Sequence, residues 1–248
     1  AAAGVRGTNT PDVLTGTTAD FGFALLMAAA RRITEGERYL RAGQWKDWRY
    51  DLLAGAEVHG STLGIIGMGR IGRGIARRAA HGFGMEVLYY NRTRLPPALE
   101  AECKARHVGK DVLLANADHV VLVLPYTPDN HHTIGAQELA RMKPTATLVN
   151  IARGGIVDEA ALAAALREGR LAAAGLDVFE GEPAVHPDLL TLPNVVLTPH
   201  IASATVATRR AMANLAADNL IAFFDGRGPL TPVNHLPGAD EFLCQNGL

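Results

Sequence analysis

Cysteine is scarce in this chain, because its 248 residues include only Cys103 and Cys244, which lie far apart. Two distant cysteines exclude a disulfide-stapled fold and indicate a reducing, cytoplasmic setting. Long apolar runs are also missing: the longest candidate, residues 21–30, stops at two arginines and is too short to cross a membrane. Charge of one sign is not in excess either, since the formal net charge is −1, which argues against a nucleic-acid-binding protein.

The most informative stretch runs from Ser61 to Arg94 and has the pattern of a strand, a glycine turn, a helix and a second strand. Its turn carries three spaced glycines, Gly67, Gly69 and Gly72. The first permits a tight turn, the second lets a pyrophosphate approach the backbone, and the third lets the helix pack closely on the strand. Because a helix N-terminus also attracts anions, the stretch predicts a dinucleotide site rather than a purely structural turn.

The end of the second strand indicates which dinucleotide binds. An acidic residue at this place usually accepts hydrogen bonds from the ribose hydroxyls of NAD. This chain has Asn91 followed by Arg92, Thr93 and Arg94 instead. A carboxylate would repel a 2′-phosphate, whereas guanidinium and hydroxyl donors would hold one. We therefore expect NADP(H) to be preferred, with an ordinary solvated basic loop as the alternative and NAD(H) still possible.

Strands and helices alternate along the rest of the chain, which predicts an α/β fold with a doubly wound parallel sheet. The expected strands cover residues 63–66, 87–90, 119–124, 146–150, 171–177 and 195–198. Besides the helix after the glycine turn, we expect helices over residues 138–142, 158–168 and 205–224, and a long apolar one between Ala19 and Leu40. Its wide apolar face predicts burial under the domain or against another subunit.

Ligands of such sheets bind beyond the carboxyl ends of the strands, and three strand ends carry reactive side chains. Arg153 follows one expected strand, Glu182 lies beyond the next, and His200 beyond the third. A histidine can give a proton to a carbonyl oxygen, a neighbouring carboxylate favours its imidazolium form, and an arginine can anchor a substrate carboxylate. Taken singly, each residue also has a non-catalytic interpretation: Arg153 as a surface ion-pair partner, Glu182 as a solvated loop acid and His200 as a structural histidine. Glu180 is an alternative to Glu182 as the carboxylate.

Several motifs together resemble the D-isomer-specific 2-hydroxyacid dehydrogenase family, and within it the glyoxylate/hydroxypyruvate reductases. The likeness runs from about Asn9 to Asn234. The motifs that carry it are Asn9-Thr10-Pro11, the glycine turn, Leu124-Pro125-x-Thr127, Asn150-Ile151-Ala152-Arg153-Gly154-Gly155, Gly175-Leu176-Asp177-Val178-Phe179-Glu180-x-Glu182-Pro183 and Thr198-Pro199-His200-Ile201-Ala202-Ser203. The resemblance implies reduction of small 2-oxo acids by hydride transfer, with Arg153, Glu182 and His200 as the catalytic residues and His200 as the proton donor.

The resemblance also implies the residues that hold the cofactor and the partner of the chain. The cofactor residues are Gly67, Met68, Gly69, Arg70, Ile71, Gly72, Asn91, Arg92, Thr93, Leu124, Pro125, Ile151, Ala152, Arg153, Asp177, His200 and Ala202. Members of this family are dimers, so we expect a homodimer formed through the helix between Ala19 and Leu40 and the arm that follows it.

The chain departs from the family in its domains. Residues 9–204 match the dinucleotide-binding domain and residues 205–235 match a C-terminal helix and tail of the substrate domain, while the N-terminal part of that domain has no counterpart here. We therefore expect a fragment that binds cofactor but turns over poorly.

Two other functions stay open at this level. One is an NAD(H)-sensing protein like the carboxy-terminal-binding co-repressors, and the other is an inactive remnant that only binds nucleotide. The choice among glyoxylate, hydroxypyruvate and 2-ketogluconate also stays open. The adjacent His131 and His132 lie near Asp129, but neighbouring histidines seldom reach one ion without further ligands, so we expect no metal site.

Overall fold

The computed structural model describes residues 5–234, and the chain divides into two units. One unit, Thr18–Ala202, contains the sheet, and the other combines residues 5–17 with residues 203–234. Cys244, the end of the expected C-terminal segment at His235 and the tail beyond it lie outside the described residues.

Seven parallel strands form the sheet of the larger unit, in the order β3-β2-β1-β4-β5-β6-β7. The strands are β1 (Thr62–Ile66), β2 (Glu86–Tyr90), β3 (Ala105–His107), β4 (His119–Leu122), β5 (Thr147–Asn150), β6 (Ala173–Leu176) and β7 (Val195–Leu197). The chain builds outward from β1 to β3, returns to β4 on the other side of β1, and builds outward again. This confirms the doubly wound parallel sheet and puts the reversal of strand order between β1 and β4, where ligands of such folds bind.

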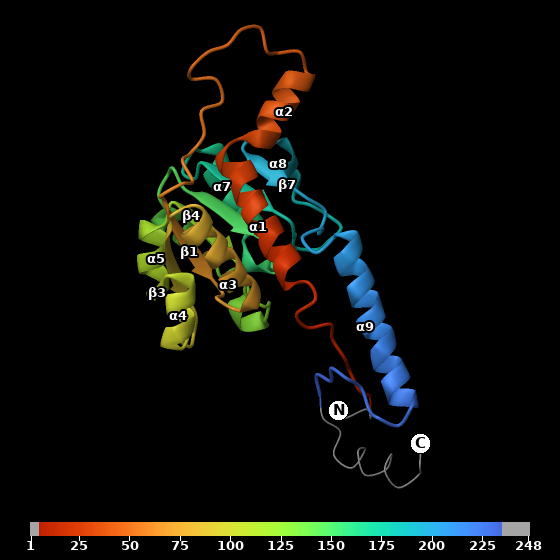
Figure 1. Ribbon diagram of the computed structural model, residues 1–248. Helices are drawn as coiled ribbons and strands as arrows, with labels where there is room; N and C mark the ends of the chain where they lie inside the picture. The colour runs from red at the N-terminus through yellow and green to blue at the C-terminus, as the bar shows by residue number, and fades with distance from the viewer. Residues whose placement is uncertain (1–4, 235–248) are drawn as a thin grey trace. The chain divides into compact units, whose positions relative to one another are not determined.

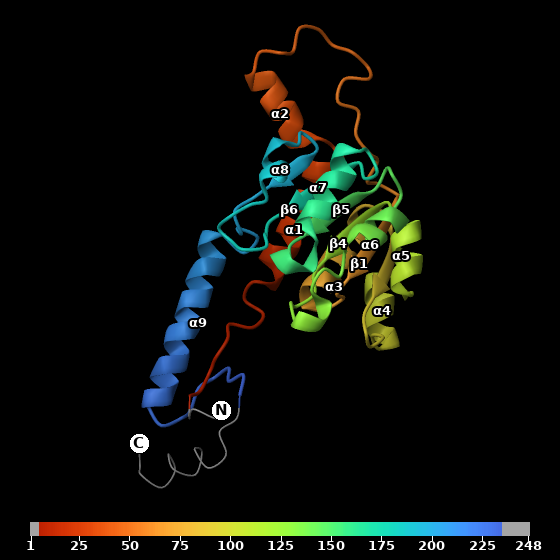
Figure 2. The ribbon, with the colours of Figure 1, turned by 180° about the vertical axis from the view of Figure 1, so that it is seen from behind.

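Helices cover both faces of this sheet (Figures 1 and 2). They are α1 (Thr15–Ala30), α3 (Arg70–Arg77), α4 (Pro97–Cys103), α5 (Lys110–Asn116), α6 (Ala136–Arg141), α7 (Glu159–Arg167) and α8 (Pro187–Thr191). Another helix, α2 (Ile33–Arg41), projects beyond the sheet and covers neither face. One apolar cluster joins α1 and α3 to one face, and a second joins α5, α6 and α7 to the other. Because both faces are covered, β4, β5 and β6 are buried along their whole length, which explains their apolar sequences.

The long helix expected between Ala19 and Leu40 is wrong as one continuous element, because the chain breaks between α1 and α2. The carbonyl of Ala30 accepts a hydrogen bond from the Ala56 N–H at 2.8 Å, and Arg32 adopts a left-handed conformation with φ 53°. A Cβ at Gly55 would lie 2.3 Å from the Ala30 oxygen, so the 55–56 segment reaches this carbonyl only because residue 55 is glycine. The expected burial applies to α1, whereas α2 buries none of its residues.

Short elements account for most of the other differences from the expected pattern. The strand expected over residues 119–124 ends at Leu122, and β3, α4, α5 and α8 were not expected at all. These elements span three to seven residues, too few for a periodic pattern to emerge. The strand β3 nevertheless extends the sheet by pairing with β2, and α4 lies directly before it in the chain.

The smaller unit contains α9 (Val206–Phe224), close to the expected residues 205–224. The side chain of Thr205 caps this helix by accepting a hydrogen bond from the Thr208 N–H at 3.1 Å. The segments at the two limits of the described residues pair with each other, because Thr8 and Pro232 form an antiparallel bridge. Within residues 5–234, no helix combines the length and the apolar character needed to cross a membrane.

Candidate active site

The three glycines of the turn after β1 each occupy a position that a side chain would disrupt or fill. Gly67 has φ 103°, and a Cβ there would lie 2.6 Å from the backbone of Val123. A Cβ at Gly72 would lie 2.4 Å from the Gly67 oxygen, so the start of α3 packs directly on the turn. Gly69 has nothing within 4 Å of its Cβ position. The first and third glycines therefore build the turn, and the second leaves open space beside the helix N-terminus.

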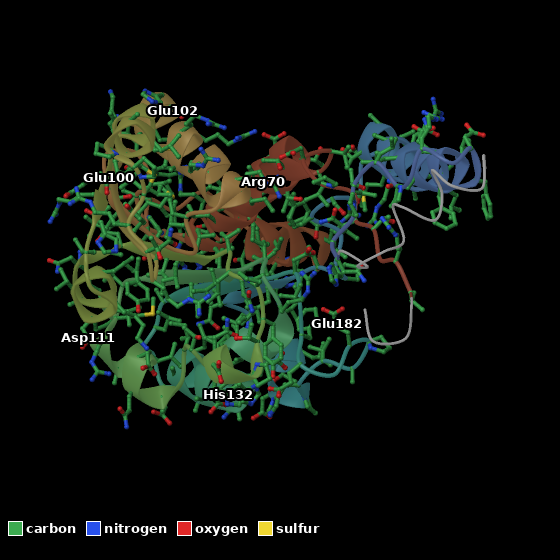
Figure 3. The ribbon with its side chains drawn as sticks, turned by 90° about the horizontal axis from the view of Figure 1, so that it is seen from below. Arg70, Glu100, Glu102, Asp111, His132 and Glu182 are labelled. Carbon is green, nitrogen blue, oxygen red and sulfur yellow. The ribbon has the colours of Figure 1, made fainter. Side chains whose placement is uncertain are left out.

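The open space at Gly69 fits the pyrophosphate of a dinucleotide. Gly69 precedes α3 without a side-chain cap, so the first N–H groups of the helix have no acceptor within it. Such groups and the helix dipole attract phosphate oxygens. Arg70, labelled in Figure 3, is exposed at the start of this helix. Met68 is fully buried, and Ile71 is half-buried.

The end of β2 lies beside this turn. The Asn91 side-chain oxygen accepts a hydrogen bond from the Met68 N–H at 2.7 Å, so it ties the end of β2 to the glycine turn. Arg92 and Thr93 follow at exposed positions, and neither has a hydrogen bond or ion pair with another residue of the 5–234 range. Arg92 and Thr93 therefore present their donors to solvent next to the turn.

His200 and Glu182 meet beyond the ends of β6 and β7. The Nδ1 atom of His200 lies 2.8 Å from a carboxylate oxygen of Glu182, while the other oxygen accepts the Phe179 N–H at 3.0 Å. Glu182, labelled in Figure 3, is about one-third exposed and His200 about one-half. The structure thus pairs the two residues that the sequence singled out, and it gives Glu180 a different partner.

The turn that carries His200 is held by a buried carboxylate. Asp177 is completely buried, and its oxygens accept hydrogen bonds from the Thr198 hydroxyl at 2.7 Å, the Ile201 N–H at 2.9 Å and the Ala202 N–H at 2.8 Å. His200 itself has φ 53°, a conformation that non-glycine residues adopt rarely. Asp177 therefore compensates a strained turn that aims the imidazole toward Glu182.

The pKa of Glu182 is lowered from its ordinary value. Partial burial acts to raise it, but the hydrogen bonds from His200 and from the Phe179 N–H, with the charge of Arg153, outweigh that effect. Glu182 is therefore a carboxylate throughout the neutral range, able to orient the ring of His200 and to balance a positive charge on it.

Arg153 is presented by the end of β5. The Asn150 side chain accepts the Ala152 N–H at 3.0 Å and donates to the Arg153 carbonyl at 2.9 Å, which folds the chain back at the strand end. A Cβ at Gly154 would lie 1.8 Å from the Phe179 carbonyl carbon, so glycine lets this segment touch the backbone of the loop that leads to Glu182. The exposed Arg153 is thereby brought close enough for its charge to act on Glu182.

A cleft of about 640 Å³ lies in front of Arg153. Its lining combines the α3 start, the segment after β4 and the two loops beyond β5 and β6: Ile71, Val123, Leu124, Pro125, Tyr126, Arg153, Gly155, Phe179, Glu180 and Gly181. The cleft thus unites predicted cofactor residues with the predicted anchor for substrate. The other predicted site residues lie outside the lining of this cleft. Glu182 and His200 do not line it, and Ile151, Ala152 and Ala202 are buried. Asn91, Arg92 and Thr93 lie at the end of β2.

A second histidine–carboxylate cluster on the rim of the cleft was missed in the sequence. Glu180 lies 2.9 Å from His132 Nε2 and 3.7 Å from His131 Nε2, and the Tyr126 hydroxyl lies 3.2 Å from His131 Nδ1. The pair of adjacent histidines was the available signal, but their partner lies about 50 residues further along the chain. The two rings stack with centroids 3.8 Å apart and planes 23° apart. One nitrogen of each ring and a Glu180 carboxylate oxygen lie within 4.8 Å of one another, so these three residues could hold a metal ion, which the sequence did not lead us to expect.

Comparisons with known proteins agree with this geometry. The pattern of the "D-isomer specific 2-hydroxyacid dehydrogenase, NAD binding domain" matches residues 23–202. The chain is 54% identical over 235 residues to a glyoxylate reductase of Thermococcus gammatolerans, covering 93% of this chain and 70% of that protein. It is 50% identical over 225 residues to glyoxylate/hydroxypyruvate reductase B of Pectobacterium atrosepticum, covering 88% and 68%.

One solved structure is informative about ligands. An NADPH-dependent glyoxylate/hydroxypyruvate reductase from Sinorhizobium meliloti, in complex with NADP and malonate, superposes with a TM-score of 0.85 at 40% identity. The match covers 94% of this chain and 71% of that one.

Proposed function

We propose that this chain, which belongs to the D-isomer specific 2-hydroxyacid dehydrogenase family, carries the cofactor site and the catalytic residues of an NADPH-dependent reductase of glyoxylate and hydroxypyruvate. Family membership makes it an oxidoreductase that binds a nicotinamide cofactor and reduces 2-oxo acids. The observation that carries the finer proposal is the 2.8 Å contact between His200 and Glu182 beside Arg153.

His200 acts as the proton donor in this proposal. Its Nδ1 is engaged by Glu182, which leaves Nε2 for the carbonyl oxygen of the substrate. When bound, the reduced nicotinamide supplies the hydride that adds to the carbonyl carbon, and His200 gives its proton to the oxygen, so that the product is a 2-hydroxy acid. Glu182 stabilises the imidazolium form before the transfer and holds the ring in place.

Arg153 binds the carboxylate of the substrate. Its guanidinium is exposed at the cleft and already donates to the Ala152 carbonyl at 2.6 Å, which fixes part of its orientation. A guanidinium fork matches a carboxylate in shape and charge, and it also polarises a carbonyl next to that carboxylate. Arg153 thereby orients 2-oxo acids over other carbonyl compounds.

The cofactor preference follows from the end of β2. Arg92 and Thr93 are exposed donors beside the glycine turn, and Asn91 supplies no negative charge that would repel a 2′-phosphate. The relative from Sinorhizobium meliloti was solved with NADP, which agrees with this assignment. We therefore assign NADP(H) as the preferred cofactor and NAD(H) as a weaker one.

The proposed assembly is a cytoplasmic homodimer. The helix α2 buries no residue and exposes Ile33 and Leu40, and the arm after it exposes Trp45 and Trp48. Aromatic residues of this kind often anchor protein interfaces. We further propose that residues 9–204 act as the dinucleotide-binding domain and that α9, within residues 205–235, belongs to the substrate domain.

The decisive experiment is an assay of NADPH and NADH oxidation with glyoxylate and with hydroxypyruvate. We expect oxidation with either acid and a kcat/KM for NADPH about tenfold or more above that for NADH. A clear NADH preference would exclude the cofactor assignment. Tight NADPH binding without any turnover would favour a nucleotide-binding protein instead.

A further inference from the structure

Tyr89 is a buried tyrosine whose hydroxyl group has two partners. It stands in β2, one residue before the strand ends, and is completely buried. Its hydroxyl donates to a Glu100 carboxylate oxygen at 2.6 Å and accepts the Leu95 N–H at 2.8 Å. A buried hydroxyl needs such partners, and Tyr89 uses its own to join β2, the segment after it and α4.

Glu100 completes this connection from α4. It lies in the first turn of that helix, and its side chain is only 10% exposed. Its carboxylate accepts two hydrogen bonds from Arg94, at 2.9 Å from Nε and 2.7 Å from a terminal nitrogen. Glu100 therefore holds Tyr89 and Arg94 together, and its negative charge is matched by the guanidinium.

The network fixes both ends of the segment that carries Arg92 and Thr93. At the start, the Asn91 side chain accepts the Met68 N–H, and the Asn91 carbonyl lies 3.2 Å from the ring of His107. At the end, Leu95 is held by Tyr89. The two unpaired donor residues lie between these fixed points, and neither has a contact of its own to hold it.

We propose that Tyr89 and Glu100 are positioning residues for recognition of the 2′-phosphate of NADP(H), an inference that rests on the proposed NADPH preference. They hold the 91–95 segment so that the Arg92 guanidinium and the Thr93 hydroxyl stand ready for a phosphate group. Binding then orders less of the chain, which increases affinity without any new contact. Glu100 also holds the Arg94 side chain by two hydrogen bonds. Because the guanidinium of Arg94 balances the negative charge of Glu100, that charge does not repel the phosphate.

The test measures the dissociation constants of NADPH and NADH by calorimetry for the unchanged chain and for Tyr89→Phe and Glu100→Gln. Each variant loses one or two hydrogen bonds of the network, so we expect NADPH binding to weaken about tenfold in both. NADH binding should stay within about twofold. Glu102→Gln is the matched control, because Glu102 lies on the same helix and pairs with Arg77 instead (Figure 3). The control should leave both constants unchanged.

Three outcomes separate the possibilities. Equal weakening of NADPH and NADH in Tyr89→Phe would make the network merely structural and overturn the inference. Unchanged NADPH binding in both variants would overturn it as well. A preference for NADH in the unchanged chain would refute the proposed function itself, independently of any variant. Tyr89→Phe keeps the buried ring, so we expect it to fold. A thermal melt of each variant checks folding, and Glu100→Gln tests the same network by a second route.

Discussion

The glycine turn after β1 and the Glu182–His200 pair lie at the same edge of one sheet, yet they are built in different ways. The turn is local: six consecutive residues form it, and the backbone geometry at Gly67 and Gly72 decides its shape. The pair is assembled from two loops, with its members 18 residues apart, and the buried carboxylate of Asp177, at the start of the loop that carries Glu182, holds the strained turn at His200. The turn, which we propose binds the cofactor, is therefore shaped by steric rules, while the pair, which we propose carries the chemistry, depends on a hydrogen-bond network.

The largest effect is expected from Gly67→Ala, which disrupts the glycine turn after β1. A side chain at φ 103° is strained, and its Cβ would lie 2.6 Å from the Val123 backbone, which the hydrogen bond from the Val123 N–H to the Ile66 carbonyl holds in place. We expect a loss of about 3 kcal/mol in the free energy of unfolding and no measurable NADPH binding. Urea denaturation and calorimetry check both. Gly60→Ala is a control, since Gly60 has a positive φ but nothing within 4 Å of its Cβ. Normal NADPH affinity in Gly67→Ala would contradict this account of the turn.

Asp177→Asn disrupts the hydrogen bonds that hold the turn at His200. The new amide group would offer donors where the Ala202 and Ile201 N–H groups need acceptors, so at least one buried hydrogen bond is lost. We expect about 2 kcal/mol of destabilisation by urea denaturation and a large fall in turnover. Asp188→Asn, which removes an exposed pair with Arg167, should change little. If turnover were retained while stability fell, the turn at His200 would not depend on Asp177.

The smallest expected effect is on the pH dependence of stability, and it tests whether Glu100 and its hydrogen bonds hold the end of β2. Hydrogen bonds from Arg94 and then Tyr89 lower the pKa of Glu100 from 4.5 to about 2. A lowered pKa contributes stability that is present above pH 4.5 and is lost as the pH falls toward 2. Urea denaturation should therefore show Glu100→Gln less stable than the unchanged chain at pH 6, with the difference shrinking between pH 4.5 and pH 2. A difference that does not vary with pH would show that Glu100 carries no such charge-dependent role.

The same contrast explains what the sequence could predict. The parallel sheet, the glycine turn and the strand ends that carry Arg153, Glu182 and His200 follow from local patterns, because apolar runs and glycine spacing act over a few residues. The break after Ala30 could not be predicted, since it depends on the distant Ala56. The partners of Asp177 and the contact between Glu180 and His132 were hidden for the same reason.

The preference for Glu182 over Glu180 illustrates the limit well. Two glutamates stand two residues apart, and spacing alone leaves both open. The structure separates them by their neighbours, His200 for Glu182 and the stacked His131 and His132 for Glu180. The family resemblance selects Glu182, and the structure places its carboxylate beside the histidine after β7.

The central claim is that His200 donates a proton and does not merely hold the cofactor, and His200→Asn tests it most directly. The measurement compares NADPH oxidation with glyoxylate and the NADPH dissociation constant in the unchanged chain and in this variant. We predict a loss of turnover of about 10³-fold with NADPH affinity within about twofold. Equal losses in turnover and in NADPH affinity, or turnover that persists, would contradict the claim.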